Sequence, residues 1–148
     1  MNRLLAALAC LAILAAFLAA CGGDDDTAAP ARETLSAEDQ TGVTTAVDAV
    51  AAALQARSID DLRALYPADE RERLDDEQLS RQASCLPENA EMEIKTFEVE
   101  STRDGARARI TFGLTPESGS PFEAVRDWRF LRQDDGTWLL ANRPDCPF

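Results

Sequence analysis

The side chains with the most reactive chemistry in this sequence are four cysteines, Cys10, Cys21, Cys85 and Cys146, in a chain that contains no histidine. The lack of histidine excludes the Ser-His-Asp and Cys-His arrangements of nucleophilic catalysis, because both need an imidazole base. It also disfavours zinc, which proteins bind mainly through histidine and cysteine, so no metal or other cofactor is expected. The cysteines are therefore expected to carry a modification or a cross-link.

Paired carboxylates are the second chemical possibility, because two neighbouring acids can divide the roles of general acid and base. They occur as Asp60-Asp61, Asp75-Asp76 and Asp134-Asp135. Adjacent residues diverge on a helix, and the first pair fits a helix cap while the last fits a turn. All three pairs are expected on a solvated surface, so no catalytic residue is predicted and the chain is not expected to be an enzyme.

A signal for export occupies the start of the chain. Arg3 precedes an unbroken apolar run over residues 4–20, and a polar segment over residues 23–27 follows. A basic start, an apolar centre and a small-residue exit are typical of a secretory signal peptide, which we predict over residues 1–20. The run is at the short edge of what spans a bilayer, and an uncleaved anchor helix is the alternative.

The exit of this signal, Leu18-Ala19-Ala20-Cys21, resembles the bacterial lipobox, in which a leucine and two small residues precede a cysteine. The resemblance implies cleavage before Cys21, a diacylglycerol on its sulfur and acylation of the freed amine. It therefore implies a lipid anchor on the exported side of a bacterial cell membrane or envelope. An ordinary secreted protein is a further alternative. Residues 21–35, with two glycines, three aspartates and a proline, are expected to form a flexible tether.

Removal of the signal and lipidation of Cys21 leave two cysteines in the exported part of the chain. An even pair in an oxidising compartment favours a disulfide, so Cys85 and Cys146 are predicted to be bonded. The bond closes a loop of about 60 residues, for which chain entropy suggests about 4 kcal/mol. A reactive thiol is the alternative, and it lacks a histidine base.

The charge of the chain excludes one class of partner. The sequence has 27 acidic and 15 basic residues and a formal net charge of −12. Nucleic-acid binding needs a basic face, so no nucleic-acid partner is expected. Contact with the membrane is expected through the lipid, because an acidic surface does not adhere to anionic lipids.

The domain that follows, predicted over residues 36–148, begins with helices. Ser36 opens a capping box, and the apolar residues after it recur at spacings of 3 and 4, which predicts a helix over residues 37–57. Ser58 opens a second box and a short helix, which Pro67 ends. The first third of the domain is therefore helical.

A charged helical stretch over residues 69–83, interrupted near Asp75-Asp76, completes the helical part. The period of apolar residues then changes to 2, with a phase slip before Phe97 that suggests a bulge. Helices first and a meandering sheet last predict an α+β fold, with N-terminal helices packed on a curved antiparallel sheet of about four strands. The strands are predicted near residues 92–99, 106–114, 122–132 and 137–142.

Two segments carry a resemblance to a known family. Residues 59–67, Ile-Asp-Asp-Leu-Arg-Ala-Leu-Tyr-Pro, follow the long helix and a short polar turn, and residues 127–140 have the sequence of a twisted hairpin. Over residues 36–143 this pattern resembles the nuclear transport factor 2-like superfamily, the cystatin-like cone fold that includes SnoaL-like and ketosteroid-isomerase-like proteins. The resemblance implies helices packed in the concave face of a curved sheet, often with a pocket between them. Members include enzymes, ligand binders and exported lipoproteins of unknown role.

A pocket of that kind is expected to have aromatic walls. Tyr66 precedes Pro67, where the resemblance puts the mouth of the cone, and its hydroxyl is a candidate hydrogen-bond donor to a ligand. The default interpretation is that this tyrosine and the other aromatic residues form the core between helices and sheet, and the pocket is the alternative. The other candidate lining residues are Phe112, Trp128, Phe130 and Trp138.

Three functions are compatible with these features, and the lack of a catalytic set favours the first. It is a lipid-anchored lipoprotein with a non-catalytic domain that binds a small apolar ligand or an envelope protein. The second is an isomerase- or cyclase-like enzyme, which needs a buried acid facing the cavity, and Asp127 is expected to point away from it. The third is an accessory subunit or homodimer that uses the outer face of the sheet. A basic stripe is expected there, formed by Arg107, Arg109, Thr111 and Arg129.

Overall fold

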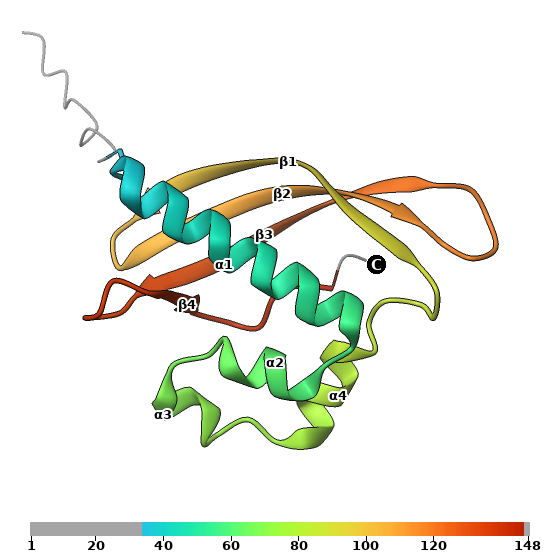
Figure 1. Ribbon diagram of the computed structural model, residues 1–148, viewed down its shortest axis with the longest axis horizontal. Helices are drawn as coiled ribbons and strands as arrows, with labels where there is room; N and C mark the ends of the chain where they lie inside the picture. The colour runs from blue at the N-terminus through green and yellow to red at the C-terminus, as the bar shows by residue number, and fades with distance from the viewer. Residues whose placement is uncertain (1–33, 147–148) are drawn as a thin grey trace, which may run out of the picture. The chain divides into compact units, whose positions relative to one another are not determined.

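The computed structural model describes residues 34–146, which form four helices followed by four strands (Figure 1). The predicted signal peptide, Cys21 and nearly all of the predicted tether lie outside the described residues. Within the described part of the chain, no helix is both long enough and apolar enough to cross a membrane. The elements are α1 (Ala37–Ala56), α2 (Ile59–Ala64), α3 (Ala68–Arg71), α4 (Asp76–Ala83), β1 (Glu91–Thr102), β2 (Gly105–Thr115), β3 (Phe122–Arg132) and β4 (Trp138–Leu140).

Helix α1 begins where the sequence predicts it. The side chain of Ser36 accepts a hydrogen bond from the backbone N–H of Asp39 at 3.1 Å, which satisfies one of the unpaired N–H groups of the first turn. The helix ends at Ala56, and Arg57 follows in the left-handed conformation with a φ of 53°. The prediction of a helix over residues 37–57 is confirmed to within one residue.

Three short helices follow, and polar caps start two of them. Ser58 caps α2 by accepting a hydrogen bond from the N–H of Asp61, and Asp75 caps α4 in the same way. Pro67 separates α2 from α3, because its ring cannot continue a helix. The charged stretch predicted over residues 69–83 forms parts of two helices, α3 and α4, which are separated by residues 72–75, next to the interruption predicted near Asp75-Asp76.

The four strands form one antiparallel sheet in the order β1-β2-β3-β4, so each strand pairs with its neighbours in the chain. This meander, placed after the helices, confirms the α+β fold. The register of β1 against β2 shifts between Ile94 and Thr96, which leaves Lys95 without a partner in the ladder. This irregularity is the bulge that the phase slip before Phe97 predicts.

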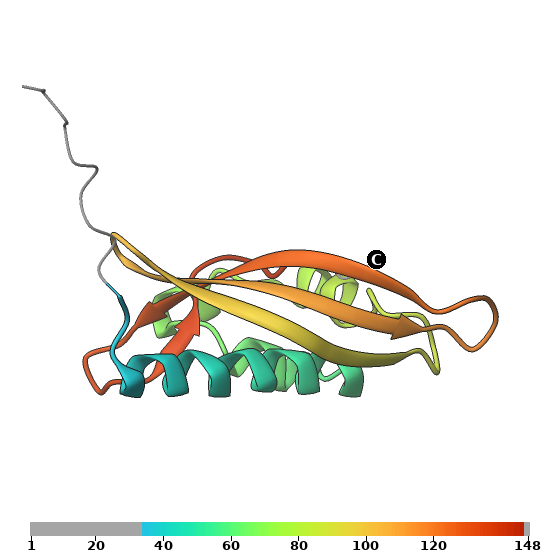
Figure 2. The same cartoon turned by 90° about the horizontal axis from the view of Figure 1, so that it is seen from above.

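The core lies between α1 and one face of the sheet. Figure 2 shows α1 running along that face with the strands arched over it. Alternate residues of β2 are buried, from Ala106 to Leu114, because successive side chains of a strand point to opposite faces. Helix α1 approaches β4 closely at Gly42, where a methyl group would lie 2.5 Å from the indole ring of Trp138. A side chain at this position would push the helix away from the sheet.

Candidate functional site

The five aromatic residues that the sequence suggests as a pocket are packed in the core. Each of them exposes 7% of its surface or less. The rings of Phe112 and Trp128 have centroids 5.2 Å apart and are tilted by 44°, a favourable arrangement for two aromatic rings. None of the five lines the hollow at the end of the sheet that is described below. In the described structure Tyr66, Phe112, Trp128, Phe130 and Trp138 fill the space between the helices and the sheet.

The hydroxyl of Tyr66 is engaged within the protein. It donates a hydrogen bond to Oε1 of Gln82, on α4, at 3.1 Å. Burial raises the pKa of Tyr66 above its ordinary value, so the hydroxyl stays protonated at neutral pH. The hydrogen bond joins the segment after α2 to α4 and satisfies this polar group without a ligand.

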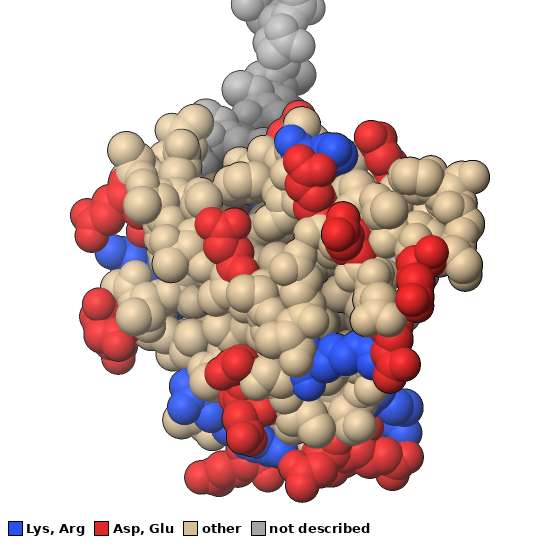
Figure 3. Space-filling view, turned by 45° about the vertical axis from the view of Figure 1, so that its right-hand side comes forward, with Lys and Arg blue, Asp and Glu red and all other residues tan. Residues whose placement is uncertain are grey.

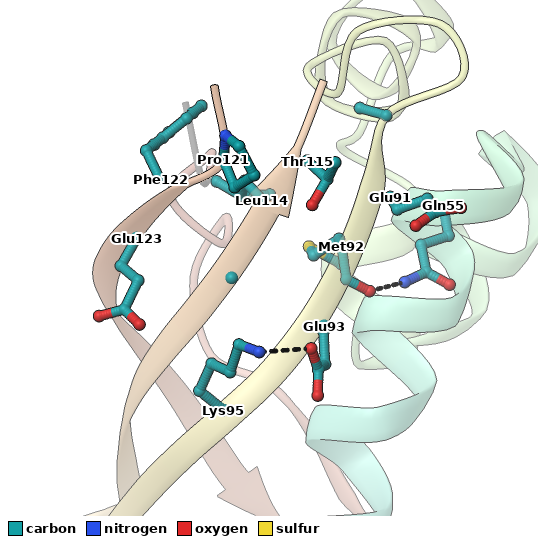
Figure 4. Close-up of a pocket in the computed structure, with 12 residues that line it drawn as sticks. Gln55, Glu91, Met92, Glu93, Lys95, Leu114, Thr115, Pro121, Phe122 and Glu123 are labelled. Atoms are coloured by element: carbon teal, nitrogen blue, oxygen red, sulfur yellow. Dashed lines mark hydrogen bonds and ion pairs between the residues drawn. The ribbon is translucent and has the colours of Figure 1, made fainter. Parts of the chain in front are cut away.

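A hollow of about 680 Å³ lies at one end of the sheet, and we call it the strand-end pocket (Figure 4). Its walls come from the start of β1, the end of β2, the start of β3 and Gln55 in the last turn of α1. Its volume is in the range of small-molecule sites. The pocket lies at the opposite end of α1 from Ala37, where the chain enters the helix, and a helix of 20 residues is about 30 Å long.

The lining of the strand-end pocket combines apolar and acidic side chains. Its apolar side chains include Met92, Leu114 and Phe122, which lie opposite one another on three neighbouring strands. Its carboxylates come from the other face of the same strands, by the alternation of side chains. They belong to Glu91, Glu93 and Glu123. Carboxylates also spread more widely than basic groups over the molecular face drawn in Figure 3.

Lys95 is the basic residue of this lining. Its Nζ lies 2.6 Å from a carboxylate oxygen of Glu93, and this hydrogen bond, the charge of Glu93 and the charge of Glu123 raise the pKa of the lysine. Its stem crosses Gly113, where a methyl group would lie 2.5 Å from Cε of Lys95. The bulge in β1 and the missing side chain at residue 113 together make room for the lysine on the sheet.

The strand-end pocket is not predicted by the sequence analysis. Two local signals point toward it, since Gly113 interrupts the best-defined strand and the phase slip marks an irregularity beside Lys95. Neither signal implies a hollow by itself. The hollow depends on the pairing register, which sets Gly113 between Glu93 and Glu123.

Residues 143–146, which we call the C-terminal strap, join the sheet to α4. Trp128 Nε1 and Arg126 Nε, both on β3, donate hydrogen bonds to backbone carbonyls of the strap at 3.4 Å and 2.6 Å. Gln82 Nε2, on α4, donates to a third strap carbonyl at 3.4 Å. The strap thus satisfies the indole N–H of the fully buried Trp128 and holds α4 against β3.

The strap also brings the two predicted disulfide partners together. The structure has Cys85 and Cys146 as thiols, and Sγ of Cys146 donates a hydrogen bond to the backbone oxygen of Cys85 at 3.3 Å. Burial raises the pKa of the Cys85 thiol to about 12, and the adjacent Cys146 adds to the rise. The disulfide stays a prediction, and the neighbouring positions of the two residues are the condition that it needs.

In the reduced protein, native Cys85 is expected to react with iodoacetamide at pH 8 at least about 100-fold more slowly than in the urea-unfolded chain, because only the thiolate reacts. The raised pKa favours the neutral thiol in the folded state. Burial of the neutral Cys85 thiol therefore contributes to the free energy of unfolding. This contribution is complete below the unfolded pKa of 9.0 and is lost as the pH rises toward the folded pKa of about 12. Mass spectrometry of the alkylated peptide, as a function of pH, measures the rate. Equal rates in native and unfolded chains would contradict the burial of this thiol.

The outer face of the sheet, which points away from α1, carries charges of both signs. Arg107 forms an ion pair with Glu100, which contributes to a raised pKa of the arginine. Arg109 stands between Glu98 on β1 and Asp127 on β3 in the register of the strands. The basic stripe expected from the sequence is therefore interleaved with the carboxylates of β1 and with Asp127, while Arg129 of β3 lies opposite Arg107.

Comparison with known proteins assigns no family. No family model matches this chain, and no curated protein sequence matches it. Among residues 34–146, no three cysteine or acidic side chains are grouped so that they could hold a metal ion. The strand-end pocket contains three carboxylates, one ammonium group and apolar side chains around a hollow.

Proposed function

We propose that this chain is a lipid-anchored bacterial lipoprotein that displays a small, non-catalytic binding domain on the exported side of the membrane. The binding part rests on the strand-end pocket, because the space between the helices and the sheet is filled by buried aromatic side chains. The resemblance to nuclear transport factor 2-like proteins supports this proposal, since ligand binders belong to that superfamily. A hollow with a few polar groups at its rim is typical of a ligand-binding site, and this observation supports the proposed binding function.

The anchoring part rests on the sequence Leu18-Ala19-Ala20-Cys21. A lipid on Cys21 would hold the chain at the membrane, and residues up to 35 would separate the lipid from α1. The strand-end pocket and the start of α1 lie at opposite ends of that helix. Anchoring through the N-terminus would therefore leave the pocket accessible.

The mature protein extracted from bacterial membranes is expected to begin at Cys21 and to be heavier than the polypeptide by a diacylglycerol and an amine-linked acyl chain. Cys21→Ser removes the sulfur that accepts the lipid and is expected to leave the unmodified precursor. Intact-mass spectrometry of both proteins makes the measurement. A wild-type chain that keeps residues 1–20 would favour the uncleaved anchor helix, and a cleaved chain without lipid would favour an ordinary secreted protein.

The isomerase-like alternative needs a buried acid that faces a cavity. Among the described residues, the fully buried side chains are apolar or aromatic. The hydroxyl of Tyr66 is engaged by Gln82, and Asp127 lies half-buried on the outer face of the sheet. These positions favour binding over catalysis.

The homodimer or accessory-subunit alternative needs an interface on the outer face of the sheet. Stable interfaces have an apolar centre with few charges. The large apolar residue that is exposed on this face is Val125, and the neighbouring ladder positions carry charges of both signs. This face supports the interface alternative less well than the strand-end pocket supports ligand binding.

A further inference from the structure

We propose that the strand-end pocket binds small aliphatic diamines or polyamines, whose ammonium groups are held by the glutamates of its rim. This inference rests on the proposed binding function and names the ligand class of the same pocket. Glu91, Glu93 and Glu123 line the pocket together with a single lysine, Lys95, which gives an excess of two negative charges. Such a rim attracts cations and repels anions.

Lys95 indicates which kind of cation the pocket accepts. The pocket already contains one alkylammonium group, that of Lys95, whose Nζ lies 2.6 Å from Glu93. The aliphatic stem of this lysine runs over the bare backbone of Gly113. The backbone of Gly113 thus forms the floor of the pocket, on which the methylene groups of the lysine lie. Glu93 accepts a hydrogen bond from the ammonium group at the end of this methylene chain. A ligand with an alkyl chain and a terminal ammonium would make the same contacts.

The other two carboxylates are placed for a ligand with two charges. Glu91 lies two residues before Glu93 on β1, and Glu123 lies opposite Gly113 on β3. Positions two residues apart on a strand are separated by about 7 Å, and positions two strands apart by about 10 Å. Glu123 borders the floor at Gly113 directly, and Glu91, opposite Thr115, lies diagonally across from it, about 12 Å away by these spacings. A linear dication can reach both carboxylates, whereas a monoamine can pair with only one.

The apolar walls favour an aliphatic cation over a hydrated inorganic one. Pro121 and Phe122 line the same hollow, and 41% of the Phe122 surface is exposed. Methylene groups that cover this surface remove apolar area from water, which a hydrated metal ion does not do. Charge at the rim and apolar area in the walls thus point to the same ligand class.

The test is a titration of the full chain, in a non-ionic detergent, with 1,5-diaminopentane and spermidine. Pentylamine and 1,5-pentanediol are matched controls with one charge and none. Calorimetry measures affinity, and the amide NMR signals of Gly113 and Thr115 report the location of binding. The diamine is expected to bind about two- to fivefold more tightly than the monoamine, to shift both amides, and to weaken as salt is added.

Charge variants separate the role of the rim from the stability of the fold. Glu91→Gln and Glu123→Gln are each expected to weaken diamine binding about two- to fivefold. Lys95→Met keeps an unbranched stem and removes the competing ammonium, so it is expected to tighten binding by a similar factor. Glu98→Gln, on the outer face of β1 but outside the pocket, is the control and is expected to leave the affinity unchanged.

Equal affinities for the diamine and the diol would overturn the inference, and so would unchanged affinity in both glutamine variants of the rim. A lysine-containing peptide that shifts the two amides when diamines do not would also overturn it, in favour of a protein partner. In all three cases the pocket would still bind a ligand and the proposed function would stand. If neutral, anionic and cationic probes all leave the amides of Gly113 and Thr115 unshifted, the proposed function fails as well.

Discussion

Replacing Phe112 by alanine is expected to lower the free energy of unfolding by about 3–5 kcal/mol. Phe112 is fully buried, and its ring packs against Trp128. It belongs to β2, which has a paired strand on each side, so the sheet cannot collapse into the cavity that the substitution leaves. Urea unfolding, followed by the fluorescence of the two tryptophans, measures the loss.

Phe122→Ala is the matched control, because it makes the same chemical change in the same sheet. Phe122 is 41% exposed, and its replacement is expected to cost about 1 kcal/mol. Similar losses for both variants would contradict the position of Phe112 between α1 and the sheet. A large loss at Phe112 alone would support the packing that makes the aromatic cluster a core.

Most of the fold is predictable because its signals are local. The caps at Ser36 and Ser58 are short motifs, and each acts on N–H groups within three residues of itself. The alternation in β2 needs only its own sequence to show which side chains share a face. Strand β4 is less well predicted: the sequence suggests residues 137–142, whereas the strand covers Trp138–Leu140. The ends of a strand depend on its pairing with the neighbouring strand, here β3.

The candidate site is less predictable because it depends on contacts between distant segments. Alternation places Phe112 and Trp128 toward the helices, but it does not tell whether the space in front of them is open or filled. The strap fills part of it, and residues 143–146 have no period or motif in the sequence that announces this role. Contacts between distant segments, such as that between the strap and Trp128, therefore decide whether aromatic residues line an open pocket or form a filled core.

The charge of the outer face of the sheet is also difficult to predict from the sequence of one strand. Arg107 and Arg109 alternate on one strand, and this alternation alone predicts a basic stripe. Their surroundings come from β1 and β3, where Glu98, Glu100 and Asp127 stand opposite the arginines. The sign of a surface patch therefore follows from the register of three strands, which the sequence of one strand does not contain.

Replacing either Cys85 or Cys146 by serine, in protein kept under oxidising conditions, is expected to lower the free energy of unfolding by about 4 kcal/mol. The reason is the long loop between them, since the two residues are 61 positions apart and a disulfide restricts the unfolded chain over that whole distance. The bond would also hold the strap, whose carbonyls bind Trp128 and Arg126. Urea unfolding with and without a reductant measures the loss.

The double variant Cys85→Ser/Cys146→Ser decides whether one bond or two separate thiols are responsible. If the residues form a disulfide, the double variant is expected to lose as much stability as either single variant, because each substitution removes the same bond. Reductant should destabilise the wild type by a similar amount and leave the serine variants unchanged. If the thiols act independently, the two single losses add instead. Equal unfolding of the wild type and the double variant under oxidising conditions would mean that the bond does not form and that hydrogen bonds alone hold the strap.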